Sequence, residues 1–189
     1  PPYRRARIMS LLHPWEDPLG SGYQLIQSMI SVGSGGLMGR GLGLGVQKLG
    51  FLPDAPSDFI FALVSEELGF IGAGAVVLMF LLIVWEGLRV ALRAEDRFGA
   101  AVAFGIAALF GIQGAIHMGV VTGSLPTTGM TLPLVSAGGS SLFVGMAAAG
   151  LLVNVAARAE SPGGEEPTPW YKDTPFYEEW LHARVLDPL

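Results

Sequence analysis

Two adjacent carboxylates, Glu16 and Asp17, stand between two prolines in the stretch HPWEDPLGSGYQLIQS, residues 13–28. A carboxylate beside a substrate hydroxyl acts as a general base when it removes the hydroxyl proton. An Asp-Pro pair also favours a turn, because the residue before proline is pushed out of helical geometry, and an acid just before a helix complements the helix dipole. These residues leave catalysis and turn formation both open for Asp17. Glu16 is expected to support its neighbour or to be solvated.

Three further acids, Asp58, Glu66 and Glu67, lie at the start of the first long apolar block. Acids in this place stabilise a helix N-terminus, and they are equally able to orient loop cations or a metal ion. The segment before this block also carries five cations: Arg4, Arg5, Arg7, Arg40 and Lys48.

Other motifs point away from chemistry. The stretch GRGLGLG, residues 39–45, has Val46 where a dinucleotide-binding loop needs its third glycine, and no Gly-Lys-Ser/Thr follows. It predicts a backbone that bends sharply or approaches another segment closely. The three histidines are too scattered for a metal site. His117, on an apolar block, is more often a packing residue than a ligand.

The composition favours a membrane protein. The chain is 51% hydrophobic and 14% charged, with no cysteine, whereas a soluble domain has about a quarter charged residues. A net charge of −5 argues against a nucleic-acid partner. The missing cysteines exclude disulfides and thiol chemistry. The opening PPY, without methionine, signal peptide or apolar span, predicts a piece of a longer protein.

The apolar blocks predict an all-α, polytopic helical membrane protein, a fragment of a larger helical bundle. We expect three spans near 59–88, 97–122 and 133–157, within a membrane region of 59–158. Residues 1–58 form a long external loop carrying the acidic motif, and 159–189 form a largely disordered tail. Within the loop, residues 23–32 have helical spacing, which predicts a short amphipathic helix. Its apolar face contains Tyr23, Ile26, Met29 and Ile30, and its polar face contains Gln24, Gln27, Ser28 and Ser31.

The loop charges predict the topology. Arg89, Arg93 and Arg97 separate the first two spans, whereas the loop TGSLPTTGMTLPLVSAGGSS, residues 122–141, has no charge. The positive-inside rule places the arginine linker and the tail in the cytoplasm, and the neutral loop and residues 1–58 outside. The five cations before the first span run against this bias. Either the topology is inverted or these cations have a function.

Two long motifs resemble one family. Residues 13–72, HPWEDPLGSGYQLIQSMISVGSGGLMGRGLGLGVQKLGFLPDAPSDFIFALVSEELGFIG, and residues 125–141, LPTTGMTLPLVSAGGSS, are similar in type and order to the SEDS family, the FtsW/RodA/SpoVE proteins. The resemblance covers about residues 1–158 and only the carboxyl-terminal half of such proteins. The motifs WEDP, GLGLGVQK and LPDAPSDFIF are closer to the division member FtsW than to RodA. Pro56, His117 and Ser124 depart from the family's usual residues.

The resemblance implies a peptidoglycan glycosyltransferase that polymerises lipid II during cell division. It implies a multi-pass protein of the bacterial inner (plasma) membrane, working among membrane lipids with a class B penicillin-binding protein and other division proteins. Asp17 aligns with the family's essential aspartate and would be the general base for the acceptor's 4-hydroxyl. One carboxylate suffices because a lipid pyrophosphate leaves as a stable anion and needs no acid. The transfer is expected to invert the anomeric centre.

The same resemblance gives the other polar residues a role. Arginine forks suit phosphate oxygens, so the cations and Gln24 are expected to bind substrate. Their supporting acids would be Glu16, Asp58, Glu66 and Glu67, with a divalent cation, Mg or Mn, as a possible helper and no organic cofactor. Three alternatives remain: a lipid II flippase without glycosyl transfer, a RodA-type elongation homologue, and a scaffold that recruits wall enzymes.

Overall fold

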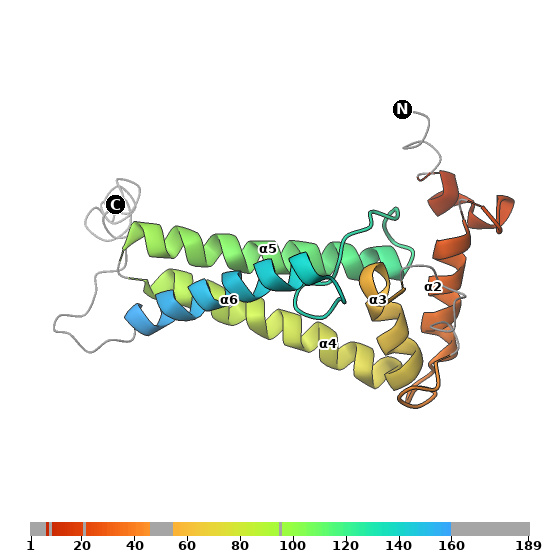
Figure 1. Ribbon diagram of the computed structural model, residues 1–189, viewed down its shortest axis with the longest axis horizontal. Helices are drawn as coiled ribbons and strands as arrows, with labels where there is room; N and C mark the ends of the chain where they lie inside the picture. Colours follow the sequence, from red (N-terminus) through yellow and green to blue (C-terminus); the bar gives the residue numbers. More distant parts are fainter. Residues whose placement is uncertain (1–6, 8, 21, 46–54, 95, 160–189) are drawn as a thin grey trace, which may run out of the picture. The chain divides into compact units, whose positions relative to one another are not determined.

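The computed structural model describes residues 7, 9–20, 22–45, 55–94 and 96–159. Every regular element in these ranges is a helix (Figure 1): η1 (Pro14–Glu16), α2 (Tyr23–Ser34), α3 (Ala55–Asp58), α4 (Ile60–Arg93), α5 (Arg97–Val121) and α6 (Gly139–Ala159). The expected tail beyond residue 159 lies outside the described residues, as do Arg4, Arg5 and Lys48.

Three helices are long and apolar enough to cross a membrane: α4 with 34 residues, α5 with 25 and α6 with 21. The all-helical, multi-span fold class is therefore confirmed. The third helix begins at Gly139, later than the expected 133. Leu134 has a φ of 63°, a left-handed conformation that cannot continue a right-handed helix. Residues 132–136 instead form a turn, in which Ser136 N–H donates to Leu132 O at 3.0 Å.

The chain divides into two compact units, one made of residues 1–81 and 110–146, the other of 82–109 and 147–189. The first unit has an apolar core in which Phe59, Phe61, Ala62 and Leu63 pack with Val120 and Val121. In the second unit, glycines let helices approach closely: an added Cβ at Gly87 would meet Ala107 at 2.8 Å. Close approach through small residues is typical of helix packing in lipid.

Helix α2 buries two serines of its polar face together with Ile26 of its apolar face. Ser28 and Ser31 are fully buried, whereas Ile30 is 46% exposed. Ser28 Oγ donates to Val121 O at 2.9 Å, and Ser31 Oγ donates to Ala62 O at 3.0 Å. Both serines lie on the polar face that the pattern predicts, and this part of the polar face is buried, because short hydroxyl side chains can be buried when they bond backbone carbonyls.

Helix α4 is bent near its start. Gly69 has a φ of 67° and a ψ of −161°, a conformation that interrupts the helix and that favours glycine. Figure 1 shows the short first part of α4 turning into its long second part. The sequence LGFIGAG gives no strong sign of this break, since an isolated glycine is tolerated in an apolar helix.

Candidate functional site

Asp17 lies in a tight turn between η1 and α2. Its backbone carbonyl accepts hydrogen bonds from Gly22 N–H at 3.1 Å and Gly20 N–H at 3.3 Å. A Cβ added at Gly20 would collide with the Asp17 carboxylate, and one added at Gly22 would collide with Pro14 O. The side chain of Asp17 is exposed. The turn geometry expected from Asp-Pro is therefore present, and it holds an accessible carboxylate at the amino-terminal end of α2.

The neighbouring acid lies near a histidine. Glu16 is exposed, and its Oε1 lies 3.9 Å from Nδ1 of His13. Its side chain contacts the residue three positions earlier in the chain, which suits the solvated role expected for it.

Arg7 joins two segments that are far apart in the sequence. Its Nη1 donates a hydrogen bond of 2.7 Å to the carbonyl of Thr127, in the neutral loop between α5 and α6. The same loop is held from α5, where Gln113 Nε2 donates to Thr131 O at 2.9 Å and His117 Nδ1 lies 2.7 Å from Met130 O. The contact of Arg7 with this loop was not foreseen, since no sequence pattern links the two segments.

Asp58 borders the same loop. Ser57 Oγ donates to Asp58 Oδ1 at 3.0 Å, and a Cβ added at Gly129 would lie 3.4 Å from Asp58 Oδ2. Arg7, near the start of the chain, and Asp58, in α3, therefore both border the signature LPTTGM.

Arg40, Glu66 and Glu67 form a second polar group at the other end of α2. Arg40 Nη1 lies 3.7 Å from Glu66 Oε1, and Gly43 N–H donates to Glu67 Oε2 at 3.0 Å. Because the 12 residues of α2 rise about 18 Å, this group is separated from Asp17 by the length of the helix. Arg40 and its acids thus do not join Asp17 in one constellation.

The remaining predicted site residues are less informative. Gln24 is half-buried in the first turn of α2, next to the turn of Asp17. Within the described ranges, no three Asp, Glu or His side chains gather closely enough to hold a metal ion. No chemical step is therefore assigned to a divalent cation.

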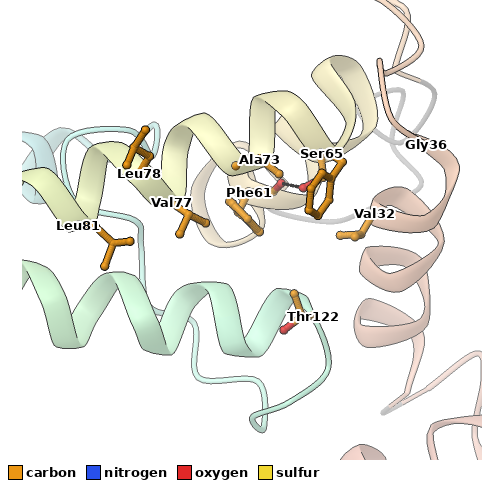
Figure 2. A pocket seen from close by; sticks show the side chains of 11 residues that line it. Val32, Gly36, Phe61, Ser65, Ala73, Val77, Leu78, Leu81 and Thr122 are labelled. Atoms are coloured by element: carbon orange, nitrogen blue, oxygen red, sulfur yellow. Dashed lines mark hydrogen bonds between the residues drawn. The ribbon is translucent and has the colours of Figure 1, made fainter.

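An apolar cavity of about 480 Å³ opens beside the bend of α4. It is lined from α2 by Val32, from α4 by Phe61, Ser65 and Val77, and from the end of α5 by Thr122 (Figure 2). The Ser65 hydroxyl donates to Phe61 O at 2.7 Å, and the Thr122 hydroxyl donates to Met118 O at 2.9 Å. The Ser65 hydroxyl is thus bonded within α4, and the Thr122 hydroxyl is bonded to the last turn of α5. The cavity has the character of a packing surface and carries no acid or base.

Three long apolar helices and polar loops held by backbone contacts define the class: a multi-pass helical membrane protein. The chain belongs to the FtsW/RodA/SpoVE family, since the family profile, described as "Cell cycle protein", matches residues 1–161. The resemblance seen in the two sequence motifs is therefore confirmed.

Named relatives are similar over most of the chain. A probable peptidoglycan glycosyltransferase FtsW of Geobacter metallireducens is 55% identical over 156 residues, covering 82% of this chain and 42% of that protein. The stage V sporulation protein E of Bacillus subtilis is 55% identical over 154 residues, with the same coverage. A solved structure described as "Structural coordination of polymerization and crosslinking by a peptidoglycan synthase complex" has a TM-score of 0.63 at 32% identity, over 85% of this chain and 44% of that one. The chain thus spans 42% of the length of these two relatives.

Proposed function

We propose that this chain is part of a peptidoglycan glycosyltransferase that polymerises lipid II into glycan strands during cell division. The observation that carries the proposal is the 55% identity to a relative named as a probable peptidoglycan glycosyltransferase FtsW. The exposed carboxylate of Asp17, fixed by its turn at the start of α2, supports it.

In this reaction Asp17 acts as the general base. It takes the proton from the acceptor's sugar hydroxyl while the hydroxyl oxygen bonds to the anomeric carbon of the donor. The bond from that carbon to the lipid pyrophosphate breaks, and the pyrophosphate leaves as an anion with inversion at the carbon. Cations stabilise the departing charge; we assign this role to Arg4, Arg5, Arg7 and Lys48, with Gln24 contacting substrate. Arg40 is a weaker candidate because it faces Glu66.

The proposal includes a membrane orientation and a protein partner. Residues 1–58 lie at the outer face of the plasma membrane, where lipid II is used, and the tail lies in the cytoplasm. A class B penicillin-binding protein is the proposed partner, because the similar solved structure is described as a peptidoglycan synthase complex. We also propose that a divalent cation, Mg or Mn, assists the transfer, held by one or two carboxylates together with the substrate phosphates.

The proposal is tested by Asp17→Asn in the full-length protein, assayed with purified lipid II and the penicillin-binding partner. We expect glycan synthesis to fall by about a thousandfold or more, since the amide cannot accept the proton and a positioned base contributes about 10²–10⁴-fold. The measurement is the length and amount of polymer on a gel. Glu16→Gln is the matched control, because it removes the adjacent exposed acid and should keep most activity.

Full polymerisation by Asp17→Asn, with normal expression, would contradict the catalytic assignment. If the wild type made no polymer, and both the wild type and Asp17→Asn moved lipid II across vesicle membranes, the results would instead support a flippase.

A further inference from the structure

The carboxylate of Glu66 is the most deeply buried acid in the described residues, with 1% of the residue exposed. It lies in α4, one turn before the bend at Gly69. Ser31 Oγ of α2 lies 3.0 Å from Ala62 O and 3.4 Å from Glu66 Oε2, so that its hydroxyl faces two acceptors on α4. Arg40 Nη1 approaches the other carboxylate oxygen at 3.7 Å. One buried side chain thus contacts both α2 and the loop that follows it.

The backbone makes a second set of contacts in the same place. We call residues 35–45 the glycine loop. Its amides pair with carbonyls before the bend: Arg40 N–H donates to Glu66 O at 2.9 Å, and Gly41 N–H donates to Glu67 O at 3.0 Å. Its carbonyls pair with amides after the bend, where Phe70 N–H donates to Gly36 O at 2.9 Å. The groups that the bend releases from the helix are therefore satisfied by the loop, as a break in an apolar helix requires.

These contacts leave no room for a side chain at two of the loop's glycines, Gly35 and Gly39. A Cβ added at Gly35 would collide with Ser65 O, and one added at Gly39 would collide with Glu67 O. A Cβ added at Gly45 would lie 3.2 Å from Glu66 Oε2. The glycine loop and the start of α4 are consequently interlocked, with the Glu66 carboxylate at their centre.

We propose that Glu66 is a positioning residue, which fixes α2 and the attached turn of Asp17 to the bent start of α4, and that Arg40 acts through Glu66 rather than on the substrate. This inference rests on the proposed function. Its physical basis is that a buried carboxylate is strongly destabilising when its partners are removed. The partners of Glu66 come from the two segments that set the position of α2.

The test compares Glu66→Gln with the wild type in the full-length protein. We expect a kcat about tenfold to a hundredfold lower, because a small misplacement of a catalytic group has effects of this size. The KM for lipid II should stay within about twofold, since no substrate contact is removed. Glu86→Gln is the control: Glu86 is an exposed acid on the same helix, 3.0 Å from Arg89, and its replacement should change neither constant.

A second readout does not depend on activity. Amide hydrogen exchange in residues 23–45 of the full-length protein should become about tenfold faster in Glu66→Gln, because local opening reports the stability of that segment. Exchange unchanged from the wild type would overturn the proposal, whatever happens to the activity. If the wild type made no polymer, the proposed function would fail, and exchange would still decide whether Glu66 holds α2.

Arg40→Met removes one partner of Glu66 while Ser31 Oγ remains 3.4 Å from the carboxylate, and its kcat is measured on folded, purified protein. It should lower kcat, and the double variant with Glu66→Gln should be no slower than Glu66→Gln alone, because both changes disable the same contact. Losses that multiply, or a raised KM with unchanged kcat, would place Arg40 on the substrate and overturn the assignment.

Discussion

His117 shows how one side chain can hold a loop that has no charge of its own. Its Nδ1 lies 2.7 Å from the Met130 carbonyl, which can only accept, so Nδ1 carries the hydrogen. In the neutral ring Nε2 is then an acceptor, and it is buried with no hydrogen-bond partner within the described ranges. His117 therefore has a structural contact through Nδ1, and this hydrogen bond holds the loop between α5 and α6.

Replacing this histidine tests its role. His117→Leu leaves the Met130 carbonyl without its donor, and we expect the free energy of unfolding to fall by about 1–3 kcal/mol. The measurement is the unfolding midpoint of the full-length protein in detergent micelles. Thr122→Val, which removes exposed hydroxyl contacts near the same loop, should change stability by less than about 0.5 kcal/mol. Equal effects of the two substitutions would contradict the role of His117.

At this scale the sequence identified which residues are polar but not which are buried. Ser28 and Ser31 fall on the polar face of α2 by periodicity, yet both are buried because carbonyls of α5 and α4 accept their hydrogens. The ion pair of Arg40 with Glu66 is likewise absent from any sequence pattern. Both features come from partners distant in sequence, which a local pattern does not contain.

At the scale of elements, the bend of α4 depends on a single glycine. Gly69→Ala should be strongly destabilising, by about 2 kcal/mol or more, because a positive φ is strained for alanine and the added Cβ would collide with Gly39 N. Gly74→Ala on the same helix meets no atom within 4 Å and should be neutral or slightly stabilising. Thermal unfolding of both variants in micelles is the measurement. A stable Gly69→Ala protein with normal polymerisation would show that the bend is dispensable.

The elements themselves were largely predictable. Long uncharged blocks between Leu68 and Trp85, and between Phe98 and Val121, predicted α4 and α5, because few other structures need such segments. The start of α6 and the break in α4 were missed. Each is associated with a residue of positive φ, Leu134 before α6 and Gly69 in α4. A leucine or a glycine within an apolar stretch does not by itself predict that conformation.

At the scale of the whole molecule, the topology gives a further prediction. These 189 residues contain no cysteine. Once any cysteines elsewhere in the full-length protein are replaced, a single cysteine can therefore be introduced as a labelling site. Leu42→Cys, at a residue 76% exposed in the glycine loop, should react with a membrane-impermeant maleimide in intact cells. Arg93→Cys, at the carboxyl end of α4, should react only after permeabilisation if this end is cytoplasmic, as the positive-inside rule predicts. The opposite pattern would invert the orientation and remove Asp17 from the outer face.

The family could be recognised from the sequence because two long motifs occur in the right order, and the matched profile over residues 1–161 confirms it. The arrangement of the candidate site could not be predicted from the sequence. Arg7 reaches Thr127 across 120 positions of the chain, and Asp17 and Arg40 lie beyond opposite ends of α2. Such distances follow from tertiary packing rather than from spacing.

The interlocked bend also bears on how the protein is made. Ribosomes synthesise a chain starting from its amino end, so residues 35–45 emerge before the part of α4 that they contact. The backbone amides and carbonyls that the bend at Gly69 leaves without helical partners can therefore bond residues 35–45 as soon as α4 is made. Without these partners they would face hydrocarbon, where each unpaired group costs several kcal/mol. A circular permutant in which residues 35–45 are translated last would reverse this order, and its newly inserted helix would be exposed to quality-control proteases until the loop arrived.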